Sequence, residues 1–292
     1  MFTDILITGL PAGCLYALVA ASFNILYRPT NVFNFAQGDL VMLGAMLFVM
    51  LTTIGWMPWQ LALLLGIVGV GLIAVVIERV AVAPLLRRST HGHGWIITTL
   101  AISMIVANVA GKVWGADPVA VSAPFGLGTE PIDMGGLLIP SYQIALVALT
   151  LVLIAGIEAL YQTRMGRAVL GVAESRDTAL LRGINPATLS VWSFFLGGAL
   201  AGLTGYLAAP ILFASTSLGA GLLLKGFAAA ALGGLGSNRG ALVAGVVIGL
   251  TESTSSSFLP AGYQNAVILA VVLTVLLLRP QGIFGNIHAR AV

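Results

Sequence analysis

Residues 183–224 read GINPATLSVWSFFLGGALAGLTGYLAAPILFASTSLGAGLLL and contain no Asp, Glu, Lys or Arg. An α-helix needs about 20 apolar residues to cross the hydrocarbon core of a bilayer, so this run is long enough for two crossings. The charge-free run 40–77 is also long enough for two. Four shorter runs fit one crossing each: 5–27, 89–111, 134–157 and 253–278. Because lipid cannot hydrogen-bond an exposed backbone, we expect these crossings to be helices.

Charged residues are scarce along the whole chain, and this decides the fold class. The 292 residues are 59% hydrophobic and 8% charged, whereas soluble domains carry about 25% charged residues. Lipid is therefore the solvent for most of the protein. We predict an all-α fold, a polytopic transmembrane helical bundle that forms a single domain over residues 1–292. The one cysteine excludes an internal disulfide, and the net charge of +3 does not indicate a nucleic-acid partner.

The turn residues between the apolar segments divide the chain into nine predicted spans. Their approximate ranges are 5–27, 35–53, 60–83, 95–115, 140–161, 190–213, 220–236, 240–257 and 263–279. Nine crossings with the N-terminus outside place the arginine-rich loops on the inner side, as the positive-inside rule requires. The opposite loop, 116–139, carries acids instead. With eight crossings, the segment 35–53 would be re-entrant.

Glycines four residues apart predict where helix backbones pack closely, because small residues let two helices approach. The pairs are Gly9/Gly13, Gly198/Gly202 and Gly245/Gly249.

The hydrophilic stretch 162–189 is the most informative loop. Residues 167–175 and 177–182 both have helical patterns. Gly183 suits the left-handed position that ends a helix. Asn185 followed by Pro186 suits an N-cap and the first turn of the next helix. These signals predict a short amphipathic elbow on the inner face.

The elbow has two interpretations. With Leu180 and Leu181 as apolar contacts, it suits a rigid link to a soluble partner. Alternatively, it is a solvated basic loop that only follows the positive-inside rule.

A second polar segment begins the span at 35–53. Asn34, Gln37 and Asp39 carry polar groups into its mouth, and burying such groups without partners costs about 2–7 kcal/mol. They could line a translocation path. They could also cap the start of a helix, where an acid suits the helix dipole.

Lys225 and Glu252 are the charges placed furthest inside predicted spans. Charges within a membrane usually mark pathways or ion pairs. We therefore consider both residues candidates for the translocation path and for a pair with each other. Alternatively, Lys225 snorkels to the outer interface. The polar run after Glu252, residues 253–257, is expected to face a partner subunit or an outer vestibule.

The sequence argues against catalysis by this chain. It contains no G-x-x-x-x-G-K-[ST] motif for ATP and no G-x-S-x-G nucleophile motif. His91 and His93 give only two metal ligands, so a juxtamembrane polar loop explains them better than a metal site. We predict that the chain is not an enzyme and binds no cofactor or metal.

Several short segments recur here in a characteristic order and spacing. They are NFAQGD (34–39), ER (78–79), PLLRR (84–88), GRA (166–168), ALLRGIN (179–185), FLGGALAG (195–202), LKGF (224–227), GGLGS (233–237) and RPQGIFG (279–285). In this combination the chain resembles, from end to end, the branched-chain amino acid ABC transporter permeases of the LivH kind. Two positions depart from that pattern: Asp39, where Glu is more frequent, and Gly226, where Ala is commoner.

The resemblance implies a permease subunit in the inner membrane of a bacterium, working by ATP-driven alternating access. Its implied partners are a second, LivM-like permease, two ATP-binding subunits and an extracytoplasmic solute-binding protein, with ATP held by the partner subunits. The elbow would be the coupling element to the ATPase, through Arg167, Glu174, Arg176, Asp177, Leu180, Leu181 and Arg182.

The solute stays open within this resemblance. A branched-chain amino acid, urea, a short amide or an aromatic acid could each be carried. Outside it, a stand-alone secondary transporter or channel is the alternative, and it predicts buried carboxylates or a broken helix near the membrane midplane.

Overall fold

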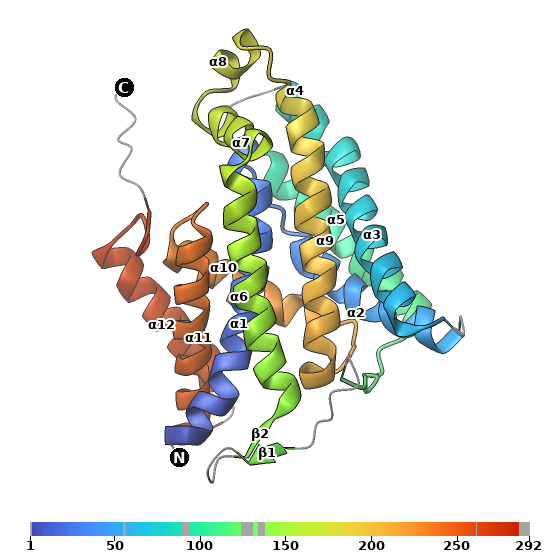
Figure 1. Ribbon diagram of the computed structural model, residues 1–292, viewed down its shortest axis with the longest axis vertical. Helices are drawn as coiled ribbons and strands as arrows, with labels where there is room; N and C mark the ends of the chain where they lie inside the picture. The colour runs from blue at the N-terminus through green and yellow to red at the C-terminus, as the bar shows by residue number, and fades with distance from the viewer. Residues whose placement is uncertain are drawn as a thin grey trace. The chain divides into compact units, whose positions relative to one another are not determined.

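The computed structural model describes residues 2–54, 57–88, 94–123, 131–133, 138–260 and 262–285. Over these ranges the chain is almost entirely helical (Figure 1). A helix covers each of the nine predicted spans: α1 (Phe2–Thr30), α2 (Gln37–Ile54), α3 (Trp59–Ile77), α5 (Gly94–Trp114), α6 (Ser141–Gln162), α9 (Pro186–Leu212), α10 (Leu218–Gly233), α11 (Asn238–Phe258) and α12 (Tyr263–Leu278). The predicted all-α polytopic fold is confirmed.

The remaining elements are short. A π-helical turn (Glu78–Val82) joins α3 to α4 (Ala83–Arg88), and the elbow consists of α7 (Arg164–Glu174) and α8 (Arg176–Leu181). Strands β1 (Pro131–Asp133) and β2 (Leu138–Pro140) pair antiparallel in the acidic loop, and the sequence analysis predicted neither strand.

Six helices in the described part of the chain are long and apolar enough to cross a membrane, namely α1, α3 with its continuation, α5, α6, α9 and α11. The helices α2, α10 and α12 are apolar but shorter. The protein is therefore multi-pass, and the count of eight or nine crossings stays a prediction that depends on these three.

Contacts divide the chain into two compact units. Unit 1 comprises Met1–Asn24, Phe125–Gly156 and Leu224–Val292, and unit 2 comprises Ile25–Pro124 and Ile157–Leu223. Helices α1, α6 and α10 each contribute residues to both. The single transmembrane domain therefore stays a prediction.

In unit 1, α1 and α11 pack through the predicted glycine pairs. A Cβ added to Gly9 would lie 3.0 Å from the Gly249 carbonyl oxygen, and one on Gly245 would lie 2.7 Å from that of Gly13. The hydroxyls of Thr8 and Ser253 are 2.5 Å apart along the same contact. Both pairs of glycines thus mark a close backbone approach, as predicted.

In unit 2, α9 packs on α2 and α3 through small residues. Gly202 meets Val70 of α3, and Gly198 meets Ala74 of the same helix. On the side facing α2, a Cβ added to Gly205 would collide with the Val41 carbonyl oxygen. Such contacts leave no space for even one methyl group.

Gly205→Ala is therefore expected to destabilise the protein by about 1–3 kcal/mol, the usual cost of overpacking. Gly111→Ala, on α5 of the same unit, is the matched control because no atom lies within 4 Å of its added Cβ. Thermal unfolding of the two purified variants checks this. Equal stabilities would contradict the packing of α2 on α9.

Candidate functional site

The elbow forms as its turn chemistry predicts (Figure 1). Thr163 caps α7 by accepting a hydrogen bond from the Gly166 N–H (3.2 Å). Gly183 has φ +77°, the left-handed conformation expected after α8. Asn185 caps α9 by accepting from the Ala187 N–H (3.0 Å), and Pro186 occupies the first turn. The predicted helices are confirmed, although α7 begins three residues earlier than expected.

The elbow has a small apolar core of its own. Val169, Val172, Ala179 and Leu189 are buried together, so α7 and α8 are fixed against the start of α9. Leu180 and Leu181 point away from this core and are 56% and 89% exposed. These two leucines are the apolar contacts that the sequence predicts, and their side chains are largely uncovered in this chain.

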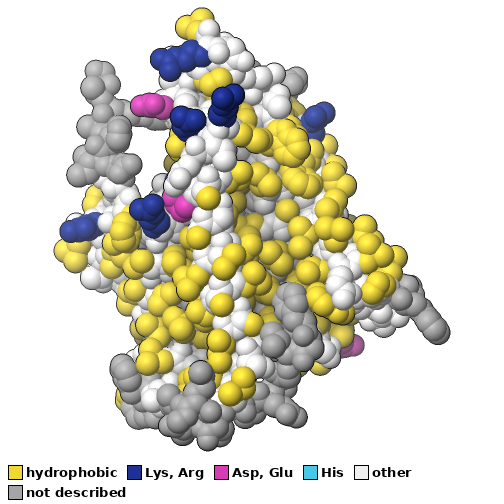
Figure 2. Space-filling model, viewed as in Figure 1, with side chains coloured by type: hydrophobic (Ala, Val, Ile, Leu, Met, Phe, Trp, Pro, Cys, Tyr) yellow, Lys and Arg dark blue, Asp and Glu magenta, His cyan; other side chains and the backbone are white. Residues whose placement is uncertain are grey.

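Beside the core, α7 and α8 enclose a groove of about 720 Å³. Its lining includes Arg167, Glu174 and Arg182 from the predicted coupling residues, together with Arg164 and Thr178. Figure 2 shows Lys and Arg side chains gathered around α7 and α8, whereas hydrophobic side chains cover the long helices below them. The other predicted coupling residues are Arg176, which is half-buried, and Asp177, which is exposed.

The side chains of Asn34 and Gln37 form hydrogen bonds that hold the start of α2 in place. The Asn34 Oδ1 accepts from the Ala36 N–H (3.2 Å), and its Nδ2 donates to the Gln37 Oε1 (3.4 Å). The Gln37 Nε2 in turn donates to the Gly197 carbonyl (3.1 Å). Asn34 and Gln37 are both fully buried. Asn34 thus closes the turn before α2 and Gln37 joins α2 to α9, and a role for either residue on the translocation path stays a prediction.

This network also locates the start of α2. Gly197 is the twelfth residue of α9, about 17 Å along that helix at 1.5 Å per residue. The N-terminus of α2 therefore lies inside the bundle of unit 2 rather than at one of its ends. The charge-free run around it gave no indication of this depth.

Asp39 lies in the first turn of α2 and is 8% exposed. Its Oδ2 is buried and has no hydrogen-bond partner among the described residues. The helix dipole favours a carboxylate at this position. The unpaired oxygen, however, retains an acceptor that capping does not use, so a role on the translocation path stays a prediction.

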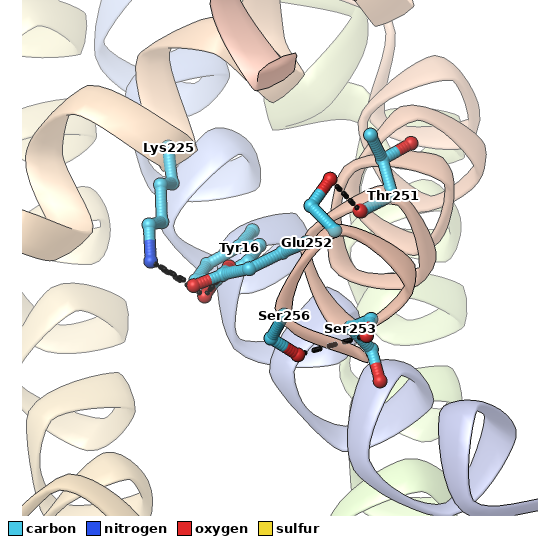
Figure 3. Close-up of polar contacts among 7 residues, drawn as sticks. Tyr16, Lys225, Thr251, Glu252, Ser253 and Ser256 are labelled. Atoms are coloured by element: carbon cyan, nitrogen blue, oxygen red, sulfur yellow. Dashed lines mark hydrogen bonds and ion pairs between the residues drawn. The ribbon is translucent and has the colours of Figure 1, made fainter. Parts of the chain in front are cut away.

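A second polar cluster lies in unit 1, where Tyr16 from α1, Lys225 from α10 and Glu252 from α11 converge (Figure 3). Lys225 and Glu252 form an ion pair, as the sequence suggested. The Tyr16 hydroxyl donates to the Glu252 Oε2 (2.5 Å), and the Lys225 Nζ donates to the Tyr16 hydroxyl (3.2 Å). The Lys225 Nζ also lies 5.2 Å from the centre of the Tyr16 ring.

The structure places Lys225 in an ion pair, and snorkelling of its side chain to the outer interface stays a prediction. Lys225 is the eighth of the 16 residues in α10, and its Nζ turns toward Tyr16 and Glu252. Each charged side chain keeps about a fifth of its surface exposed, 21% for Lys225 and 19% for Glu252. The two charged side chains are therefore largely buried, although neither is completely enclosed by this chain.

Ser253 bonds to Thr8 of α1, whereas the serines that follow it bond within α11 itself. The Ser255 and Ser257 hydroxyls donate to carbonyls one turn back, those of Thr251 (2.7 Å) and Ser253 (2.9 Å). Bonds of this kind satisfy a hydroxyl within its own helix. The polar run is thus compatible with a lipid environment, and its predicted exposure to a partner or vestibule stays a prediction.

Sequence reasoning did not single out Glu78 beyond its place in a motif. Glu78 is 2% exposed, in the π-helical turn at the end of α3. Its Oε1 accepts from the Ser190 hydroxyl (2.8 Å) in the first turns of α9. The carboxylate therefore ties α3 to the part of α9 that directly follows the elbow.

Ser190→Ala is expected to destabilise the protein by about 1–3 kcal/mol, because it removes the donor from a buried carboxylate. Ser256→Ala serves as the control, since this serine is exposed and bonds only within its own helix. The melting temperature of the purified variants measures the difference. A Ser190→Ala variant as stable as the control would show that the bond contributes nothing.

Within the described ranges, no three or more His, Cys, Asp or Glu side chains are placed to hold a metal ion. His91 and His93, considered above as a metal pair, lie outside those ranges.

Comparisons with a family model and with individual proteins point to the same family. The family described as "Branched-chain amino acid transport system / permease component" matches residues 5–276. The LivH permease protein of the high-affinity branched-chain amino acid transport system of Escherichia coli K12 is 30% identical, covering 98% of this chain and 96% of its own. The BraD permease protein of the corresponding Pseudomonas aeruginosa system is 29% identical, over 96% and 95% of the two chains.

A probable LivH permease from the archaeon Methanocaldococcus jannaschii is also 29% identical, covering 93% of this chain. No solved structure matches. The family match spans nearly all of the apolar helices described above, together with both polar clusters and the elbow. The chain therefore belongs to the family of permease components of branched-chain amino acid transport systems.

Proposed function

We propose that this chain is a membrane-spanning permease subunit of an ABC importer, and that it carries a small amino-acid-like solute, a branched-chain amino acid, by ATP-driven alternating access. The observation that carries the proposal is the elbow, a capped pair of short helices with two uncovered leucines beside a charged groove. The transport systems named for its relatives support the choice of solute.

The elbow is packed so that a movement of the ATPase would be transmitted to α9. Its core fixes α8 against the first turns of α9, so a force on Leu180 or Leu181 acts directly on a long apolar helix. Exposed apolar side chains surrounded by charges are typical of the centre and rim of a protein interface. The ATPase would therefore seat Leu180 and Leu181 in an apolar pocket, with the arginines of the elbow at the rim.

The proposal assigns the remaining components to other chains. Because this sequence lacks an ATP-binding motif, two separate subunits would bind and hydrolyse ATP. A second, LivM-like permease would complete the path, and an extracytoplasmic binding protein would select and deliver the solute. The assembly would lie in the inner membrane of a bacterium. Asn34, Gln37 and Asp39, together with Lys225 and Glu252, are our candidates for the path.

A stand-alone secondary transporter is the second candidate, and one observation favours it. Asp39 is a buried carboxylate with an unpaired oxygen at a helix start inside the bundle, and transporters of that class bind coupling ions at such places. That class has no use for the elbow, which is why we prefer the importer.

Affinity purification of the tagged chain from its native membranes in a mild detergent tests the proposal. We expect two ATP-binding subunits and a second permease to co-purify in stoichiometric amounts. Purification of a homogeneous, folded permease without any ATPase would contradict the importer and leave the stand-alone transporter.

A further inference from the structure

The Tyr16–Lys225–Glu252 cluster is not explained by stability alone. Desolvating two charges costs about as much as their attraction returns, and apolar replacements of buried pairs are often neutral or stabilising. Ionisable residues inside a membrane protein more often mark the route of a substrate. An ion pair whose lysine lies at the middle of α10 is therefore expected to have a function beyond holding helices together.

The pair presents one positive and one negative group, and neither side chain is completely enclosed by this chain. About a fifth of each charged side chain is exposed, although Tyr16 and the two charged residues come from three packed helices. Tyr16 donates to one oxygen of Glu252, so this carboxylate keeps a fixed partner if Lys225 leaves it. Lys225 likewise keeps the Tyr16 hydroxyl and ring as neighbours. The pair can therefore open without leaving either group bare.

We propose that Lys225 and Glu252 form the subsite for the charged head of a zwitterionic solute, Lys225 binding its carboxylate and Glu252 its ammonium. This inference rests on the proposed transport function and assigns the two charged groups of its solute to named residues. The two residues exchange their bond to each other for bonds to the solute, and they pair again when the solute leaves. Re-pairing keeps the empty path free of isolated charges, which would be costly in a membrane.

The chemistry selects among the solutes considered above. An α-amino acid carries one ammonium and one carboxylate, so it replaces both members of the pair without changing the net charge of the site. Urea and short amides carry no charge and cannot compete with an ion pair. An aromatic acid would satisfy Lys225 and leave Glu252 without a cation.

The decisive variant exchanges the charges, Lys225→Glu with Glu252→Lys. It keeps an ion pair, so a purely structural pair predicts normal folding, normal assembly with the ATPase and normal uptake. A head-group subsite also predicts folding and assembly, but the reversed site no longer matches a solute presented in the native orientation. We expect ATP-driven uptake of labelled leucine by the reconstituted complex to fall about tenfold or more, the effect of losing charged hydrogen bonds.

Uptake within about twofold of the wild type by the exchanged variant would overturn the proposal. If this variant does not fold, the neutral variant Lys225→Met/Glu252→Gln replaces it, with the same expected loss and the same contrary result. The wild-type complex provides a test that needs no variant, uptake of leucine compared with urea and with 4-methylpentanoate. ATP-driven uptake of urea or of 4-methylpentanoate in place of leucine would overturn the subsite but not the importer. Absence of any ATPase from the complex would overturn the importer itself.

Discussion

Replacing Leu180 and Leu181 together with aspartate is expected to remove the ATP-binding subunits from the purified complex and to abolish ATP-driven uptake. Both leucines are exposed, at 56% and 89%, so the permease itself loses little packing. In a partner's pocket they would be the buried anchors, and truncating such an anchor costs about 2 kcal/mol or more. Adding two buried carboxylates increases the loss further. The combined change corresponds to a loss of affinity well beyond tenfold.

Leu259→Asp is the matched control. Leu259 is 41% exposed directly after α11, away from the elbow in the chain and on the predicted outer side. This control tests whether one exposed leucine replaced by aspartate elsewhere in the chain affects assembly, without touching the proposed contact. Quantifying ATPase subunits per permease after purification distinguishes the variants. An elbow variant that retains the ATPase as well as Leu259→Asp does would disprove the coupling role of these leucines.

Removing one member of the Lys225–Glu252 pair is expected to be the most damaging single substitution in unit 1. Lys225→Met leaves a largely buried carboxylate, and Glu252→Gln leaves a largely buried ammonium. Breaking a buried pair in this way costs about 3–5 kcal/mol. Because about a fifth of each side chain is exposed, we expect a value near the lower end, about 3 kcal/mol. This should lower the melting temperature by roughly 6 °C or more.

The double variant Lys225→Met/Glu252→Gln supplies the control for this prediction. It removes both charges at once, so it should recover most of the stability that either single variant loses. Melting temperatures of the four proteins complete a double-mutant cycle. Losses that simply add, with the double variant least stable, would mean that the two charges are not coupled.

The sequence predicted the helices well because the hydrocarbon core of a membrane offers no hydrogen bonds to an exposed backbone. A stretch without charges, long enough to cross, has few alternatives to a helix in lipid. The end of the elbow was predictable for a different reason, since Gly183, Asn185 and Pro186 each have a strong positional preference at a helix end. The packing glycines of α1 and α11 were also recognisable from their spacing.

Depth was not predictable, and neither were the long-range contacts other than the Lys225–Glu252 pair. A continuous apolar run does not show that α2 begins beside Gly197 of α9. Hydropathy predicts which residues are in the membrane, but it does not predict at which residue of a neighbouring helix a second helix begins. Tyr16 gave no signal within its apolar segment, although its hydroxyl completes the Lys225–Glu252 cluster. Glu78 was recognised only as part of a motif, because its bond to Ser190 joins residues 112 positions apart.

ATP-driven uptake into proteoliposomes tests the central claim most directly. The complex would be reconstituted with its binding protein on one side, labelled leucine on the same side and ATP on the other. We predict accumulation of leucine that requires hydrolysable ATP and persists when proton and sodium gradients are collapsed. Accumulation by this chain without ATPase subunits, driven by an ion gradient, would contradict the account and identify a secondary transporter.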